Sequence, residues 1–259
     1  MSKQDRQGVR TPADIERKYD LGQDFSQIEK LAANAQRSAE MAYKVAAEAY
    51  AAASKVTTDI ESILARLDAL ENGSLPSGYT ALEYIQSSGT QYIDTGFKPN
   101  QDTRLVMDAQ ITDSATRHLF GARTSASSNM FFAACLSANT VRADFGTKQN
   151  THTVPSVLDR MTWDVSKTGC TIGDTSSTFT AETFSPNVTM ALFASNTNGT
   201  IVVDTYKAKM KLFACQIYDN GVLVRDFVPV KNSNGDAGLF DRIGLKFYGN
   251  AGSGAFTGA

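Results

Sequence analysis

The chain has 259 residues, of which 42% are hydrophobic and 20% are charged, and its formal net charge at pH 7 is −2. This near-neutral balance argues against binding to nucleic acid or to anionic membranes by charge alone. No apolar run approaches the roughly 20 residues of a membrane-spanning helix, so we expect no membrane insertion.

The start of the chain, MSKQDRQGVR, is polar and lacks the apolar h-region of a secretory signal peptide. We therefore expect synthesis in a cytoplasm without a signal peptide. Three scattered cysteines, Cys135, Cys170 and Cys215, suit neither a disulfide framework nor a zinc site. We expect them to be buried and reduced.

Residues 1–22 form the first predicted unit, which contains one short helix. Thr11 is suited to cap this helix and Pro12 to occupy its first position. Gly22 is predicted to end it, and Asp24 to cap the helix that follows. Two interpretations remain for this unit: an ordinary surface helix, or a docking segment that attaches the chain to a larger particle.

Residues 23–72 are predicted to form a stalk, because apolar residues recur there in a strict seven-residue repeat. An amphipathic helix on a globular core follows a 3.6-residue period and drifts from such a repeat, whereas a left-handed coiled coil keeps it. The stalk would be about 70 Å long at 1.5 Å per residue. Its partner must be another copy or another protein; the alternative is a long single helix lying on the second half of the chain. All fourteen a and d positions are apolar: Phe25, Ile28, Ala32, Ala35, Ala39, Ala42, Ala46, Ala49, Ala53, Val56, Ile60, Ile63, Leu67 and Leu70.

The number of strands in this coiled coil follows from which residues occupy the repeat. Isoleucine at both an a position (Ile60) and a d position (Ile63) favours three or four helices over two. Apolar side chains at e and g widen the apolar face further, and these are Tyr43, Tyr50, Leu64, Leu31 and Val45. We therefore favour a parallel homotrimer over a dimer.

The composition changes after a short Gly- and Pro-containing linker at residues 73–78. Glutamate occurs in residues 79–259 only at Glu83 and Glu182, and Thr, Ser, Asn, Gly, Phe and Val become frequent. Strand-like runs alternate with turn clusters about every ten residues. The pattern predicts a mainly β unit, one antiparallel β-sandwich over residues 79–259.

Three stretches of this unit have specific strand patterns. LEYIQSSGTQYIDTG (82–96) is predicted to pair two short strands around Ser-Ser-Gly-Thr. RLVMDAQIT (104–112) places its apolar residues on one face of a strand, and its polar residues mainly on the other. The third stretch, 207–230, is predicted to be a hairpin that turns at Asp-Asn-Gly (219–221). Its lysines at 207, 209 and 211 alternate with apolar residues, which predicts a half-solvated strand.

The opening LPSGYTALEYIQSSGTQYIDTGFKPN, the short FGAR, and the closing CQIYDNGVLVRDFVPVKNSNGDAGLFDRIGLKFYGNAGSG resemble a concanavalin A-like jelly-roll module. This module is common in tail and baseplate proteins of phages and prophages from gut Firmicutes. The N-terminal GVRTPADIERKYDLG is also similar to the start of structural proteins from such phages. The resemblance implies a lectin-type fold and a place in a virion, but it does not identify a ligand.

We expect no catalysis by this chain, and no cofactor. Jelly-roll relatives that cleave polysaccharides have carboxylates in a Glu-x-Asp-x-x-Glu pattern, and this sequence lacks that spacing. Two histidines, His118 and His152, have no Ser or Cys nearby in the sequence that would suggest a triad. The aspartates are dispersed, so we predict no metal site, although a calcium ion in a loop stays open.

Glycan-contacting residues are predicted in three places. Trp163, the only tryptophan, would stack on a sugar ring or belong to the core. The polar loops 122–130 and 194–201 have the Asn, Ser and Thr content of carbohydrate-contacting loops, and ordinary solvated turns would have the same content. The candidates from these loops are Asn129, Asn196 and Asn198.

The leading hypothesis is a phage or prophage tail-tip protein, a homotrimer with a helical stalk and lectin-like heads. The N-terminal segment would dock on other tail or baseplate proteins, and the heads would adsorb to host surface glycans. A structural or decoration protein of the virion that binds no ligand is the rival. A carbohydrate-active enzyme is a third, disfavoured hypothesis.

Overall fold

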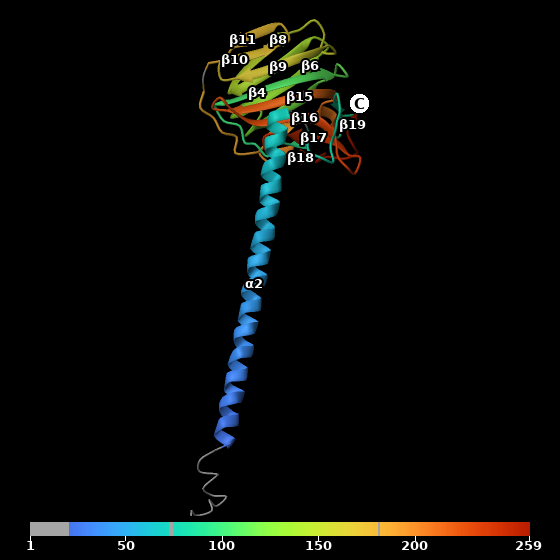
Figure 1. The fold of residues 1–259 in the computed structure, drawn as a ribbon. Helices are drawn as coiled ribbons and strands as arrows, with labels where there is room; N and C mark the ends of the chain where they lie inside the picture. Colours follow the sequence, from blue (N-terminus) through green and yellow to red (C-terminus); the bar gives the residue numbers. More distant parts are fainter. Residues whose placement is uncertain (1–20, 73–74, 181) are drawn as a thin grey trace, which may run out of the picture. The chain divides into compact units, whose positions relative to one another are not determined.

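The structure, a computed structural model, describes residues 21–72, 75–180 and 182–259, and the chain clusters into two compact units that divide between Leu64 and Ala65. The described residues form one long α-helix and antiparallel β-sheets arranged as a jelly-roll-like sandwich (Figure 1). Within that part of the chain, no helix is long and apolar enough to cross a membrane.

Helix α2 (Leu21–Asn72) covers the predicted stalk without a break. Its 52 residues correspond to a length of about 78 Å. Gly22 lies in its first turn, so the prediction that this glycine ends a helix was wrong. A helical glycine costs only about 1 kcal/mol relative to alanine, and the good helix formers that follow outweigh this cost. The predicted short helix and docking segment lie in residues 1–20, which are outside the described part.

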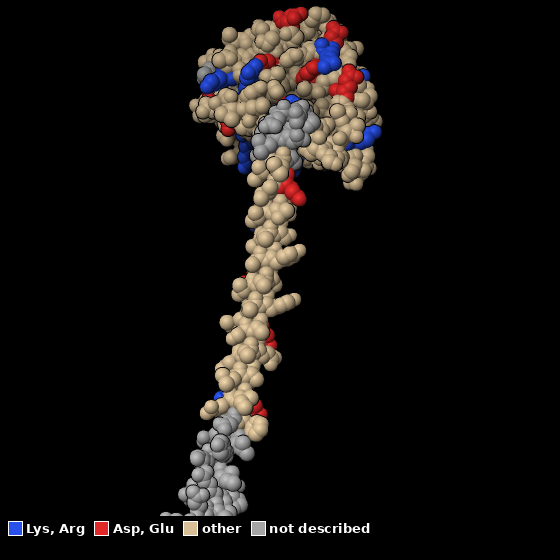
Figure 2. Space-filling model, viewed as in Figure 1, with Lys and Arg blue, Asp and Glu red and all other residues tan. Residues whose placement is uncertain are grey.

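The apolar stripe of α2 is exposed in a single chain. Phe25, Ile28, Val56, Ile60 and Ile63 are each between 50 and 63% exposed. The alanines between them are exposed too, and most of the visible surface of α2 is neither acidic nor basic (Figure 2). The side chains at the last a and d positions, 67 and 70, lie outside the described set. The coiled coil therefore stays a prediction.

The larger sheet, here called sheet A, has 11 strands within the described residues. Its main path runs β11-β10-β9-β4-β15-β16-β17-β18, while β1 pairs with β16, and β2 pairs with both β15 and β19. The bounds are β1 (Thr80–Ala81), β2 (Ile85–Gln86), β4 (Thr103–Ile111), β9 (Arg160–Ser166), β10 (Gly169–Ile172), β11 (Thr175–Thr178), β15 (Met210–Asp219), β16 (Val222–Lys231), β17 (Ala237–Asp241), β18 (Lys246–Tyr248) and β19 (Thr257–Gly258).

The second sheet, sheet B, has 8 strands in the described residues, along the path β14-β13-β5-β6-β7-β8; β12 pairs with β5, and β3 pairs with β12. Its pairs are antiparallel except for β13, which runs parallel to β5. A short 3-10 helix, η1 (Asp204–Tyr206), precedes β15. The bounds are β3 (Ile93–Asp94), β5 (Arg117–Arg123), β6 (Met130–Ser137), β7 (Thr140–Gly146), β8 (Lys148–Thr153), β12 (Ala191–Leu192), β13 (Asn196–Thr197) and β14 (Thr200–Ile201).

One apolar core fills the space between the two sheets. Because side chains alternate along a strand, every second residue of a strand faces this core. The prediction for β4 is confirmed, since Leu105, Met107, Ala109 and Ile111 are buried and the residues between them are not. Sheet B contributes aromatic residues to the same core, including Phe120, Phe131 and Phe145. The three cysteines are buried and unpaired, as expected.

The hairpin of β15 and β16 is also confirmed. Asn220 and Gly221 turn the chain with φ of +49° and +80°, the left-handed values that the Asn-Gly pair tolerates best. The half-solvated pattern before it holds for Lys209 and Lys211 but is wrong for Lys207, which is 7% exposed. Its ammonium lies 2.7 Å from the Asp204 carboxylate, and this ion pair offsets the cost of burying the charge.

The two short strands predicted around Ser-Ser-Gly-Thr exist, as β2 and β3, but they do not pair. β2 belongs to sheet A and β3 to sheet B. The side-chain oxygen of Gln91 accepts hydrogen bonds from the Ser87 hydroxyl (3.0 Å) and the Ser88 amide (2.8 Å), and these bonds hold the turn between them. The chain therefore crosses from one sheet to the other here, where local sequence suggested a hairpin.

Candidate functional site

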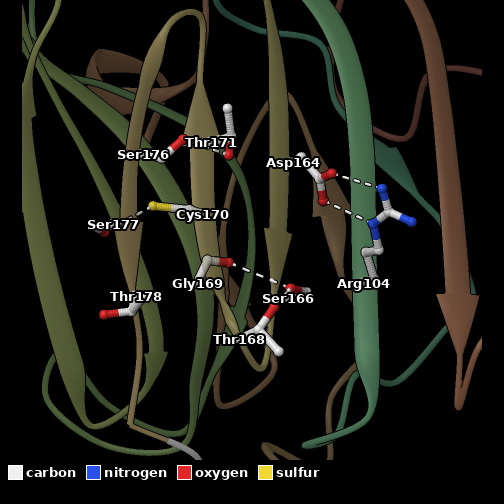
Figure 3. Close-up of a pocket in the computed structure, with 10 residues that line it drawn as sticks. All are labelled: Arg104, Asp164, Ser166, Thr168, Gly169, Cys170, Thr171, Ser176, Ser177 and Thr178. Carbon is white, nitrogen blue, oxygen red and sulfur yellow. Dashed lines mark hydrogen bonds and ion pairs between the residues drawn. The ribbon is translucent and has the colours of Figure 1, made fainter.

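A cavity of about 520 Å³ lies on the outer face of sheet A, along β4, β9, β10 and β11 (Figure 3). The alternation of β9 builds it: Asp164 and Ser166 point outward, while Trp163 and Val165 face the core. In Figure 3 the Thr171 and Ser176 hydroxyls point toward each other, and their oxygens are 2.9 Å apart.

Six hydroxyl side chains line this cavity. Hydroxyls donate one hydrogen bond and accept two, so each can bond to a neighbour and also to a polar ligand. A polyhydroxylated ligand presents the matching groups, and a lining of this kind fits a saccharide better than it fits an apolar molecule. The six are Ser166, Thr168, Thr171, Ser176, Ser177 and Thr178.

A bidentate ion pair forms one wall of the cavity. Arg104 Nε and Nη2 donate to the Asp164 carboxylate at 2.9 and 2.7 Å. The carboxylate raises the pKa of Arg104 above its usual value. Both groups keep about a third to a half of their side-chain surface exposed, so they present fixed donors and acceptors to a ligand in the cavity.

A second cavity, of about 420 Å³, adjoins the first and shares Arg104, Ser166 and Thr168 with it. It adds the half-buried ring of Tyr218, whose hydroxyl donates to Gln216 Oε1 at 2.9 Å. An aromatic ring held in this way offers an apolar face with a polar edge. We call the two cavities together the hydroxyl groove.

Trp163, the first predicted glycan contact, is wholly buried. It faces the sandwich core between two outward residues of β9, so it cannot stack on a sugar at the surface. Of the two interpretations from the sequence, the core interpretation is confirmed and the sugar-stacking interpretation was wrong.

The two predicted glycan loops, 122–130 and 194–201, lie side by side. β13 runs parallel to β5, which pairs Thr197 with Arg123. Arg123 Nε donates to Thr197 Oγ1 at 2.9 Å, and the Asn198 amide donates to the Arg123 carbonyl at 2.9 Å. The loops therefore form one surface at this end of sheet B.

The three predicted asparagines of these loops shape the backbone. Asn196 is 7% exposed, and its side chain donates to the Thr189 carbonyl and accepts from the Gly199 amide, both at 2.9 Å. Asn129 and Asn198 adopt positive φ, +49° and +51°, as tight turns require. Asn198 is exposed and Asn129 half-buried, so these two remain at the surface.

Next to these loops, the outer face of sheet B has a group of residues that we call the arginine cluster: Arg123, Arg142, Phe132 and Asp144. Both guanidinium groups lie over the Phe132 ring, with their Cζ atoms 4.9 and 5.3 Å from its centroid. Arg142 Nη2 is 2.8 Å from Asp144 Oδ2. The pair is not aligned as a hydrogen bond, and neither wholly buried Asp144 oxygen accepts one from another described group.

His118 extends the cluster toward an exposed tyrosine. Its Nδ1 is 2.8 Å from the hydroxyl of Ser195, and its ring meets Phe132 edge-on with centroids 4.8 Å apart. The ring of Tyr206, which is 43% exposed, stacks on the same imidazole with centroids 5.6 Å apart. Three rings, Tyr206, His118 and Phe132, therefore follow one another, and both guanidinium groups lie over the last of them.

Burial changes the protonation of two groups in this region. Burial raises the pKa of Asp144 to about 6, although the neighbouring arginines lower it in part. Burial also lowers the pKa of His118 to about 4, and the positive charges of Arg123 and Arg142 add to that shift. At pH 7 the cluster therefore has two positive charges, one negative charge and a neutral imidazole.

The structure also brings together a histidine and a cysteine that the sequence did not associate. His152 Nε2 lies 3.1 Å from the Cys170 sulfur and 3.4 Å from the Ser177 hydroxyl. Burial raises the pKa of Cys170 and lowers that of His152, so both groups stay neutral at pH 7. A neutral thiol is a weak nucleophile. The contact joins β8 of sheet B to β10 and β11 of sheet A.

No three His, Cys, Asp or Glu side chains gather in a metal-binding arrangement in the part of the chain that the structure describes. Neither the hydroxyl groove nor the arginine cluster was predicted from the sequence. The high Ser and Thr content of 166–178 was a local signal for the groove. The cluster had no local signal, because its members come from three strands.

No protein-family model and no curated protein matches this chain. One similar solved structure is the carbohydrate-binding module CBM40 of the Ruminococcus gnavus IT-sialidase, bound to α2,3-sialyllactose. It is 13% identical, with a TM-score of 0.39, over 54% of this chain and 90% of that one. Two NanB sialidase structures from Streptococcus pneumoniae are 13% identical, with TM-scores of 0.33, over 56% of this chain and 27% of theirs. Function is therefore inferred from this chain's own side chains.

Proposed function

We propose that this chain is a structural component of a phage or phage-like tail tip, a homotrimeric fibre whose lectin-like heads adsorb to host cell-surface glycans. The observation that supports it most is the exposed apolar stripe of α2. Large side chains at a and d positions, from Phe25 to Ile63, are at least half exposed in one chain. Water contact on this scale is unfavourable, and pairing with further copies removes it.

Trimerisation is expected to strengthen weak glycan binding. Three heads on one stalk bind a surface with a high effective concentration, so that overall avidity exceeds the affinity of each site. The hydroxyl groove is the proposed glycan contact, with the Tyr218 ring for the apolar face of a sugar and the surrounding hydroxyls for its polar edge.

Residues 1–22 are proposed to dock on other tail or baseplate proteins, which would place the chain in the virion. Catalysis, a bound cofactor, nucleic-acid binding and membrane insertion form no part of this proposal. Net charge argues against nucleic-acid binding, since at −2 the chain has no surplus of positive charge for phosphate backbones.

A specific observation favours the alternative of a structural protein without a ligand. Hydroxyls of the groove already bond to one another, Thr171 to Ser176 at 2.9 Å and Ser166 to Thr168 at 3.0 Å. A groove satisfied internally needs no ligand. The carbohydrate-active enzyme stays the disfavoured third alternative.

Binding of the full-length protein to host cells and to a glycan array separates these proposals. We expect wild type to bind, and Tyr218→Ala to bind at least tenfold more weakly while keeping its oligomeric mass. Val222→Ala is the control, because Val222 is 64% exposed and does not line either cavity. Wild type that binds no cell and no glycan would support the ligand-free alternative. Equal binding by Tyr218→Ala would place the glycan contact outside the groove.

A further inference from the structure

Arg123 differs from the other arginines of the sandwich because it has no carboxylate partner among the described residues. Each of the others lies within 4.0 Å of a carboxylate, and these are Arg104, Arg117, Arg142, Arg160, Arg225 and Arg242. Arg123 forms no such ion pair with any described residue. It is nevertheless half-buried, and burial lowers its pKa from the usual value. A partly desolvated charge without a counterion is unfavourable.

A second arginine adds to this imbalance. Arg123 and Arg142 both lie over Phe132, so two like charges are held near one ring. Among the described residues, the one carboxylate within 4.0 Å of either guanidinium is Asp144, which lies 2.8 Å from Arg142. The cluster therefore keeps one unbalanced positive charge at pH 7.

The Arg123 side chain is held in place without using its outer nitrogens. Its Nε donates to Thr197 Oγ1 at 2.9 Å, and no described group accepts a hydrogen bond from either Nη. A fixed guanidinium with two free nitrogens matches the planar, two-point geometry by which arginine binds carboxylate and phosphate oxygens.

The surroundings of the cluster fit a ligand that also has hydroxyl groups. Thr197 and the exposed Asn198 lie on one side of Arg123, and the half-exposed Tyr206 ring stacks on His118 nearby. Nucleic acid is disfavoured, because one unbalanced charge is too small a footprint for a phosphate backbone.

We propose that Arg123 and Arg142 form a subsite for one oxyanion, a carboxylate or a phosphodiester, carried by a polyhydroxylated polymer. The oxyanion would bind Arg123 through its two free nitrogens, and Arg142 would add a second positive charge. Asp144, 2.8 Å from Arg142, is a positioning residue that attracts this guanidinium by its charge. Oxyanion binding stands independently of the hydroxyl groove, whereas the polymeric nature of the ligand rests on the proposed function.

Calorimetric titration of the full chain with two matched probe pairs tests this subsite. Glucuronate is compared with glucose for the carboxylate, and bis-glycerol phosphate with glycerol for the phosphodiester. We expect wild type to bind at least one anionic probe at least tenfold more tightly than its neutral counterpart. The probe that binds more tightly identifies the source of the oxyanion. Equal affinity within both pairs would overturn the proposal.

Variants separate a formed site from a general charge effect. Arg123→Gln is expected to weaken binding of the anionic probe tenfold or more, and Lys231→Gln, which removes an exposed positive charge, to leave it unchanged. Arg123→Lys keeps the charge but loses the planar fork, so it should also weaken binding. Equal affinity of wild type and Arg123→Gln would refute the site. Tyr218→Ala should bind the anionic probe like wild type even if the groove binds no glycan.

Discussion

The helix α2 and the sandwich differ in where their large apolar side chains lie. Ile60 and Ile63 of α2 are 50 and 53% exposed, whereas Trp163, Phe120 and Phe145 of the sandwich are wholly buried. The sandwich thus has its own core and should fold without a partner. The helix has no core within one chain, so its stability should depend on other copies and on protein concentration.

The largest expected effect is the loss of oligomerisation when apolar residues of the stalk are removed. Ile60→Ala with Ile63→Ala removes six apolar carbons per chain, worth about 5 kcal/mol per chain at about 0.8 kcal/mol per buried CH₂. Light scattering should give about three times the 27.9 kDa chain mass for wild type and a smaller mass for the variant. Lys44→Ala, outside the apolar repeat, is the control. A wild-type monomer at micromolar concentration would contradict the stalk.

The next largest effect should be a loss of stability that is confined to the sandwich. Trp163→Ala empties the largest wholly buried site, and such changes cost about 3–5 kcal/mol. We expect the near-ultraviolet circular dichroism of the sandwich to melt earlier, while the helical signal and the oligomeric mass persist. Val106→Ala on the outer face of β4 is the control. Loss of the helical signal together with the sandwich would mean that the two units do not fold independently.

Local patterns predicted much of this contrast. The seven-residue repeat predicted an uninterrupted α2, and alternation predicted β4 and the hairpin of β15 and β16. These features depend on residues close together in the chain. Two of the wrong predictions involve residues far apart in the chain: the buried Lys207 ammonium lies over the Tyr92 ring, and β2 and β3 joined different sheets. The error at Gly22 was local, because neighbouring helix formers outweighed its low helix propensity.

The candidate sites also depend on contacts between distant residues, which local sequence patterns do not predict. The loops 122–130 and 194–201 were predicted separately, and the parallel pairing of β13 with β5 made them one surface. Their asparagines were chosen for polarity, but positive φ and internal hydrogen bonds account for them. The arginine cluster joins residues of β5, β6 and β7, whose proximity follows only from strand pairing.

A third effect is the pH dependence of the folding stability of the sandwich. Burial raises the pKa of Asp144 from 3.8 to about 6, so its favourable contribution to folding is present below pH 4 and is lost as pH rises through 6. The pKa of His118 is lowered from 6.5 to about 4, so its contribution has the opposite sign: it is present above pH 6.5 and lost as pH falls through 4. In wild type, the pH dependence of folding stability from Asp144 and that from His118 should therefore largely cancel.

Asp144→Asn removes one of these opposing terms. In wild type, ionisation of Asp144 should lower the free energy of unfolding by roughly 3 kcal/mol between pH 4 and pH 7, at 1.36 kcal/mol per pKa unit. The variant lacks this loss, so its free energy of unfolding minus that of wild type should rise by the same amount over this range. Denaturant unfolding of the sandwich at both pH values measures this difference. Glu83→Gln is the control, because Glu83 is exposed and its carboxylate lies 4.0 Å from Arg160. A difference that does not change with pH would mean that Asp144 titrates normally.

The smallest expected effect concerns the alanines in the middle of the stalk. Alanine at both a and d, from Ala32 to Ala53, lets helices approach closely but buries little area at each site. This middle part should therefore be stabilised by close packing. The larger residues at the two ends should contribute most of the hydrophobic free energy.

Ala42→Leu tests this packing directly. A seam built around methyl groups has no room for a leucine, and overpacking of this kind costs about 1–3 kcal/mol. Ala51→Leu, on the opposite side of the repeat, adds the same side chain outside the seam and should change the melting temperature little. Thermal melts followed by helical circular dichroism compare the two variants. If Ala42→Leu stabilised the stalk, as it would in a loosely packed coiled coil, the alanines would reflect helix propensity alone. The stalk would then resemble the sandwich, with stability set by the apolar area that it buries.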